Sequence, residues 1–478
     1  MLLAVIVVFS APDIQPFLAF SIFRFTLRAV RINMSKARRD GLYLLLLGSL
    51  VAVLLGSVLS NTSPVAVVDF RVVYYPARCL IQHCDPYSES AVLQVVHTEG
   101  GERPSDHGNA NHFARYLYLP SAFFLTVPFA MLPWGLAHTL WIGLIEGGLI
   151  LAAFLIWNLG ADYSPVVLGA LIGFYLANCE VLMVLGNIAG IAIGLCLVGV
   201  WCFLRDRFVI GGVLCFAVSL AVKPHDSGLV WLFFLLAGGV YRRRALQTLL
   251  ATVVLGLPGT LWAWKVSPNW MQEMRSNLLA FSSHGNASDP AIALTGLHGL
   301  GMMVNLQTVF SAFWSDPHFY NLASYLVCGP LLLVWALVTV RSRSTASGAW
   351  LALAAIATLS LLPVYHRQYD SKLLLLTAPA CAMLWTERGI VGWLALLLNG
   401  LGFIVTGDIS WIAILNLIER LFASEPSLYA RILTNVQVFS VPCILLSLGV
   451  FYLWVYVARS SGKSTSVAAP DLSVARIT

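Results

Sequence analysis

Asp69 has the clearest chemical potential of any residue in this sequence. It stands among apolar residues in AVVDFRVV, shortly after the first long apolar run. A charged side chain near hydrocarbon is costly unless it is paired, hydrated or used. Such a carboxylate can act as a general base toward a hydroxyl group, with a pKa set by burial and by the nearby Arg71 and Arg78. The alternative is an ion pair that only fixes the loop.

Two polar motifs later in the chain supply cations. KPHD begins at Lys223, and YHRQYD contains His366, Arg367 and Asp370. Lys223, His366 and Arg367 could hold a phosphate, because arginine matches the geometry of a phosphate and lysine acts as a point charge. A lipid-borne phosphate suits their expected depth in the membrane. Alternatively, the lysine snorkels to the headgroups and the second motif is a local salt-bridged turn.

Further polar residues gather at the same ends of the predicted helices. Aromatic rings can stack on sugars, while amides, imidazoles and carboxylates can hydrogen-bond to hydroxyl groups. Residence at the membrane interface alone also explains tyrosine there. The candidates for binding a sugar or an acceptor are Tyr74, Tyr75, Asp85, Tyr87, Asn187, His225 and Asp370, and Arg78 is a further phosphate candidate.

Composition determines the class of protein. Of 478 residues, 59% are hydrophobic and only 10% are charged, whereas about a quarter are charged in soluble domains. Apolar runs of roughly 20 residues recur, each able to cross a hydrocarbon core as a helix. The sequence therefore predicts an all-α polytopic membrane protein. The net charge of +6 comes from short basic clusters between the runs, which argues against a nucleic-acid partner.

The basic clusters also predict the orientation of the helices. The stretch RFTLRAVRINMSKARRDG should stay in the cytoplasm by the positive-inside rule. The run 42–60 then crosses outward and leaves Asp69 on the external, periplasmic face. Continuing along the chain predicts about twelve crossings in the plasma membrane, with both termini cytoplasmic.

These crossings divide the chain into three parts. We expect a cytoplasmic or interfacial segment at 1–40, a transmembrane domain at 41–458 and a disordered cytoplasmic tail at 459–478. A long first external loop, 61–118, should carry short juxtamembrane helices, and a second external loop should cover 265–320.

Three local expectations complete the prediction from the residues. The apolar piece 119–134 contains three prolines and should be re-entrant or lie on the membrane, whereas 165–185 should be one crossing. Cys79 and Cys84 share the first external loop and could form a disulfide in an oxidising compartment. The histidines are dispersed along the sequence, so no metal cluster is predicted.

Four stretches resemble the membrane-embedded GT-C glycosyltransferases, and specifically glycosyltransferase family 87, which includes polyprenol-phosphate-mannose-dependent mannosyltransferases. The stretches are VDFRVVYYPARCLIQHCDPYS, YLPSAFFLTVPFAMLPWGLAHTLW, LMVLGNIAGIAIGLCLVGVWCFLRDR and GGVLCFAVSLAVKPHDSGLVWLFFLL. Their order and spacing, over about 42–244, are similar to the family's D-x-x-x-Y-Y, D-P-Y, Y-x-P, G-Q/N and K-P elements. Asn187 stands where glutamine is more usual, and HTEGGERPSDHGNANH lengthens the first loop.

The resemblance implies a GT-C-type fold and an inverting transferase. It would move a hexose or pentose, above all mannose, from a polyprenyl-phosphate donor to a hydroxyl of a glycolipid or glycan acceptor outside the membrane. Asp69 matches the family's base and Lys223 its K-P lysine, while His366 is a looser match. No metal or cofactor is expected. A transporter or flippase of a lipid-linked sugar is the alternative, although we see no internal repeat and the ionisable groups crowd one rim. A non-catalytic assembly subunit is a third.

Overall fold

The computed structural model describes residues 34–63, 67–99, 114–286, 288–295, 303–342 and 345–461. The predicted segment 1–40 and tail 459–478 therefore lie mostly outside the described residues, as does most of the insertion in the first external loop. The described residues are helical, apart from turns and one antiparallel bridge between Met303 and Arg367. The prediction of an all-α protein is confirmed.

Some helices are long and apolar enough to cross a membrane. They are α3 (Lys36–Thr62), α7 (Trp134–Gly160), α13 (Gly239–Val266), α16 (Pro317–Arg341) and α21 (Pro426–Ser461). Large apolar side chains such as Leu47, Val254 and Leu333 are exposed on them, as helices that face lipid require. The prediction that the chain is a membrane protein is thus confirmed. Five of the described helices qualify, or six if a bent pair is one span, so twelve crossings stay a prediction.

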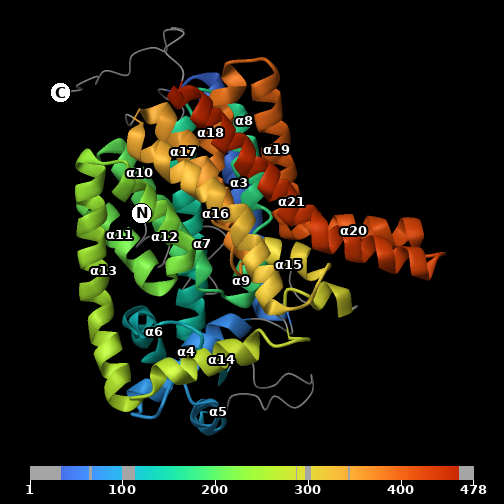
Figure 1. Ribbon diagram of the computed structural model, residues 1–478. Coiled ribbons are helices and arrows are strands. Elements are labelled where there is room, and N and C mark those ends of the chain that lie inside the picture. Colours follow the sequence, from blue (N-terminus) through green and yellow to red (C-terminus); the bar gives the residue numbers. More distant parts are fainter. Residues whose placement is uncertain are drawn as a thin grey trace.

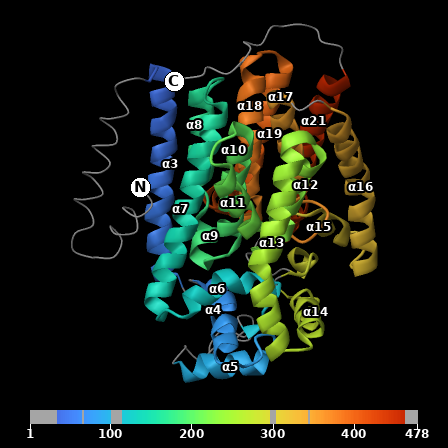
Figure 2. The ribbon, with the colours of Figure 1, turned by 90° about the vertical axis from the view of Figure 1, so that its left-hand side faces the viewer.

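Shorter apolar helices fill the interior of the bundle. They are α10 (Ala189–Arg205), α11 (Val209–Val222), α12 (Pro224–Leu236), α17 (Ala346–Leu359) and α18 (Thr377–Thr386). α17 is buried at every position from Ala349 to Leu359, and a helix that is apolar all round belongs in such a core. α10 packs on both α7 and α11 (Figures 1 and 2).

Small residues let two helices approach each other closely. Gly41 and Gly48 on α3 face Gly169 and Gly173 on α8 (Pro165–Leu176), and a Cβ at Gly48 would collide with the backbone carbonyl of Gly173. Such close backbone approach is how membrane helices gain packing energy without a hydrophobic driving force. It explains why α3 runs beside α8 in Figure 2.

The segments at one end of the bundle form a layer of short helices. They are α4 (Val68–Ile81), α5 (Glu89–Thr98), the 3-10 turn η2 (Pro120–Ala122), α6 (Phe123–Ala130) and α14 (Trp270–Phe281), and they lie at the bottom of Figures 1 and 2. A disulfide joins Cys79, in the last turn of α4, to Cys84, which follows the helix. The segment 119–134 is thus two short elements before α7, and neither is long enough to span. This layer holds Asp69 in the first turn of α4.

One expectation about the helices is wrong. The predicted crossing 165–185 is two helices, α8 and α9 (Glu180–Leu185). They are separated at Asn178, whose side chain accepts a hydrogen bond from the backbone N–H of Ser410 at 2.9 Å. A second break follows α19 (Ile390–Thr406), where α20 (Asp408–Phe422) continues at an angle of 80° and projects sideways in Figure 1.

Candidate active site

Asp69 is fixed by contacts with the connection between α9 and α10. Val67, which precedes α4, has a left-handed backbone (φ +53°) and donates its N–H to the carbonyl of Val184 at 2.6 Å. Asn187 Nδ2 then donates to Asp69 Oδ2 at 2.7 Å, while Asn187 Oδ1 accepts from the N–H of Ala189 at 2.8 Å. Because Asn187 is held at both ends, the Asp69 carboxylate has a defined orientation, and it remains partly exposed.

Burial raises the pKa of Asp69 above the ordinary value for aspartic acid. The hydrogen bond from Asn187 and the charges of Arg367 and Lys223 oppose this increase, and the charge of Asp370 adds to it. A raised pKa makes the carboxylate a stronger base than an exposed aspartate, provided that it is ionised at the working pH.

The acid limb of the pH–rate profile tests the contact between Asn187 and Asp69. Asn187→Ala removes a hydrogen bond that lowers the pKa of Asp69, so this pKa rises further. The ionised base then forms only at higher pH, and the acid limb of kcat/KM should move to higher pH. Asn187→Gln keeps an amide, so its acid limb should lie close to that of the unmodified protein. An unmoved limb in Asn187→Ala would show that Asp69 is not the group whose ionisation limits the rate.

Lys223 lies at the junction of α11 and α12, in a buried cluster of charges. Its Nζ pairs with Asp370, lies 3.1 Å from Asp226 Oδ2 and sits 5.1 Å from the ring centre of Tyr369. Burial alone would lower the pKa of Lys223, but the two carboxylates raise it above the ordinary value. The lysine is therefore charged, and it does not snorkel to solvent as a lone cation.

The second polar motif folds against the first. Asp370 Oδ2 accepts a hydrogen bond from the N–H of Arg367 at 2.9 Å and so closes the turn that begins the 3-10 helix η4 (Gln368–Leu376). His366 is buried, and its Nε2 lies 3.7 Å from Asp226 Oδ1. The expected local turn therefore exists in the backbone, but the Asp370 carboxylate also reaches across to Lys223.

The fold brings most of the predicted reactive residues together. Asp69 and Arg367 interact electrostatically and are both partly exposed. Tyr118 was not singled out from the sequence, yet its phenol interacts with Lys223, Asp69 and Asp370. Its signal was present in the Y-x-P element YLP, which follows the first loop. Tyr118 therefore lies near enough to this cluster for its charges to act on the phenol.

Arg78 lies elsewhere. It is nine residues beyond Asp69 on α4, about 13 Å along the helix axis at 1.5 Å per residue. Its Nε pairs with Glu99 at 2.7 Å and its NH1 group donates to the carbonyl of Ala130 at 3.0 Å. Arg78 therefore fastens α4 to its neighbours, and its predicted contact with the phosphate has no support from this placement.

The tyrosines of α4 face its packing partners. The Tyr74 hydroxyl donates to the carbonyl of Leu132 at 2.9 Å, and Tyr75 stacks on Trp134 at 5.9 Å between ring centres. Both side chains are buried. These contacts attach α4 to the start of α7, so they position Asp69 from a distance.

Asp85 and Tyr87 shape the loop after α4. Asp85 Oδ1 accepts a hydrogen bond from the N–H of Tyr87 at 2.9 Å, an Asx turn. The buried Tyr87 hydroxyl donates to the carbonyl of Tyr118 at 2.9 Å. Tyr87 thus supports the residue that faces the charge cluster, and neither residue is placed beside Asp69 by a contact among the described residues.

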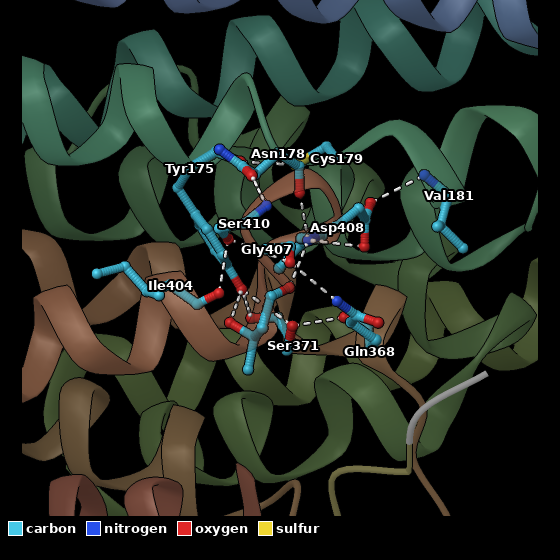
Figure 3. A network of polar contacts seen from close by, with 12 residues as sticks. Tyr175, Asn178, Cys179, Val181, Gln368, Ser371, Ile404, Gly407, Asp408 and Ser410 are labelled. Carbon is cyan, nitrogen blue, oxygen red and sulfur yellow. Dashed lines mark hydrogen bonds and ion pairs between the residues drawn. The ribbon is translucent and has the colours of Figure 1, made fainter. Parts of the chain in front are cut away.

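A second buried network lies where two broken helices meet. Lys372 on η4 donates to the carbonyls of Asn178 and Thr406 at 2.8 and 3.0 Å and lies 3.9 Å from Asp408 Oδ1. Asp408 Oδ2 accepts from the N–H of Val181 at the start of α9 at 2.8 Å. Figure 3 shows this network joining the α8–α9 break to the α19–α20 bend. Lys372 and Asp408 are thus a buried ionisable pair that the sequence had not singled out.

The buried ion pair in this network should be essential to the fold. Removing one partner of a buried pair costs about 3–5 kcal/mol, because the other charge is left without compensation. Lys372→Met should therefore lower the melting temperature of the purified protein strongly. The exposed Lys36→Met is the control and should leave it unchanged. Equal melting temperatures for the two variants would contradict this role.

A family model described as glycosyltransferase family 87 matches residues 116–364, more than half of the 478-residue chain. The chain belongs to glycosyltransferase family 87. No curated protein and no solved structure matches it. The resemblance found in the sequence over about 42–244 is thus confirmed, and the match extends beyond that stretch to residue 364.

Membership of family 87 makes this chain a membrane glycosyltransferase, with a sugar donor and an acceptor as substrates. The matched region contains Asn187, Lys223 and His225, whereas Asp69 precedes it and His366 follows it closely. The family match therefore does not cover Asp69 or His366, and the case for their roles rests on where the structure places them.

Proposed function

We propose that this family 87 protein transfers a hexose or pentose, with mannose as the first choice, from a polyprenyl-phosphate donor to a hydroxyl of a glycolipid or glycan acceptor. The reaction takes place on the external face of the plasma membrane, and both ends of the chain lie in the cytoplasm. The polyprenyl chain stays in the lipid, and the phosphate-linked sugar enters the charge cluster from the side.

In the proposed reaction the Asp69 carboxylate takes the proton of the acceptor hydroxyl. The acceptor oxygen forms a bond to the anomeric carbon as the bond between that carbon and the phosphate oxygen breaks. The electron pair leaves with the polyprenyl phosphate, next to Lys223, His366 and Arg367. Because attack and departure occur on opposite faces, the anomeric configuration inverts.

One observation carries this proposal: the acid and the cations belong to one cluster although they come from distant parts of the sequence. Asp370 pairs with Lys223 and accepts from the N–H of Arg367. The charges of Arg367 and Lys223 oppose the increase that burial causes in the pKa of Asp69, whose carboxylate Asn187 fixes. A base must lie within reach of the proton that it removes, and a leaving phosphate needs positive charge on the other side of the reacting carbon. Arg78 is left out of this reaction because it pairs with Glu99.

Transfer by the purified protein tests the proposal. The chain in lipid nanodiscs is given radiolabelled polyprenyl-phosphate mannose and a membrane-lipid extract as the source of acceptors. We expect label to move into a glycolipid or lipid-linked glycan that is also missing from cells lacking the protein. Movement of intact donor across the bilayer of a proteoliposome, with no transfer of label, would instead favour a flippase.

A further inference from the structure

Two histidines and a carboxylate converge beside Lys223. His225 and Asp226 lie in the first turn of α12, and His366 comes from the motif before η4. Asp226 Oδ1 lies 3.4 Å from His225 Nε2 and 3.7 Å from His366 Nε2. One ligand atom from each residue falls within 4.8 Å of the others. The sequence did not predict this group of three residues, because its two histidines are distant in the chain.

Two of the converging polar atoms are buried without a hydrogen-bond partner. Among the described residues, Asp226 Oδ1 and His366 Nε2 have none, while Asp226 Oδ2 pairs with Lys223 at 3.1 Å. His366 Nδ1 lies 3.1 Å from the carbonyl oxygen of Val364. A carbonyl oxygen can only accept, so Nδ1 carries the hydrogen, and in the neutral ring the lone pair of Nε2 then faces Asp226. Metal-binding histidines commonly donate their other ring N–H to a backbone carbonyl in the same way.

The spacing suits a divalent transition metal. Zinc binds histidine nitrogen and carboxylate oxygen at about 2.0–2.2 Å, which places neighbouring ligands about 3.4 Å apart in a tetrahedron. Asp226 Oδ1 lies 3.4 Å from His225 Nε2 and 3.7 Å from His366 Nε2, and both distances are close to this value. His225 is exposed, so a metal held here would keep an open side for a further ligand.

The neighbouring residues provide a second reason for a cation. Lys223 and Arg367 share the site with three carboxyl groups, those of Asp69, Asp226 and Asp370. A polyprenyl-phosphate sugar is a phosphodiester anion, which an ionised carboxylate repels. A divalent cation bound by Asp226 would offset this repulsion and strengthen the attraction of the site for a phosphate.

We propose that His225, Asp226 and His366 bind one divalent transition-metal cation, whose open side receives a phosphate oxygen of the donor. The binding site rests on the geometry of these three residues, and the role toward the donor rests on the proposed function. A bound cation would stabilise the charge that develops on the leaving phosphate. This inference replaces the expectation from the sequence that no metal takes part.

Metal binding is measured on the full chain in nanodiscs, purified without a polyhistidine tag and stripped with chelator. Titration with Zn²⁺ should give one saturable site per chain, and Co²⁺ should give the visible absorption of a nitrogen- and oxygen-coordinated ion. Asp226→Asn and His366→Gln should each weaken Zn²⁺ binding by at least about 10-fold. Absence of a saturable site, or unchanged affinity in both folded variants, would overturn the proposal.

His284 offers a matched control. It also lies beside a buried carboxylate, with Nδ1 3.0 Å from Asp289 Oδ2, but it belongs to no group of three ligands among the described residues. His284→Gln should keep the Zn²⁺ affinity of the unmodified chain, and an equal loss in this variant would overturn the site. Transfer is assayed on the same samples. A chain that transfers sugar but binds no Zn²⁺ overturns only the metal site, whereas Zn²⁺ binding without any transfer contradicts only the proposed function.

Discussion

Asp69→Asn should reduce sugar transfer by about 10²- to 10⁴-fold, the usual contribution of a general base. The amide has the same shape, so it can keep its place beside Asn187, but it cannot accept the proton of an acceptor hydroxyl. Donor affinity and expression should change little, since the phosphate is bound by other residues. The measurement is kcat for transfer, together with donor binding, on protein in nanodiscs.

Asp162→Asn is the matched control for this experiment. Asp162 is exposed and pairs with Arg38, and its substitution is chemically the same. It should leave kcat unaffected. Normal turnover by Asp69→Asn would remove the proposed base, and an equal decrease in both variants would point to general damage to the protein.

Lys223→Met should have the second large effect, and it should act on both stability and binding. The substitution leaves Asp226 and Asp370 buried together without their cation, and breaking a buried pair costs about 3–5 kcal/mol. Donor affinity should fall by about 10- to 100-fold, the range expected for losing one charge-assisted hydrogen bond. Both quantities are measured, the first by thermal unfolding and the second by donor titration.

The double variant Lys223→Met/Asp370→Asn separates the two effects. Removing one carboxylate relieves the repulsion, and the new amide can still accept the hydrogen bond from Arg367, so much of the lost stability should return. Donor affinity should stay low because the cation is still missing. Recovery of donor affinity together with stability would contradict a contact between Lys223 and the phosphate. Lys265→Met, an exposed lysine at the end of α13, serves as the control.

The sequence predicted those features that depend on local composition. The long apolar run 42–60 predicted α3 (Lys36–Thr62), because the run is uninterrupted and is flanked by polar and basic residues. Asp69 could be predicted as a candidate site residue because it stands among apolar residues, where a charge is costly unless it is used.

Features that depend on tertiary contacts were not predictable in this way. The stretch around Asn178 is apolar enough to resemble one helix, and its break is fixed by a hydrogen bond from Ser410, more than two hundred residues later. Lys372 and Asp408 each resemble the polar flank of a separate helix, and only the fold makes them partners. Arg78 illustrates the reverse case, since closeness to Asp69 in sequence did not bring it to the same site.

The structure of the protein bound to an unreactive polyprenyl-phosphonate sugar tests the central claim most directly. We predict the phosphonate beside Lys223 and Arg367 and the Asp69 carboxylate on the opposite face of the anomeric carbon, with room for one acceptor oxygen between them. A phosphonate bound elsewhere, or an Asp69 carboxylate on the same face as the leaving group, would contradict the proposed chemistry.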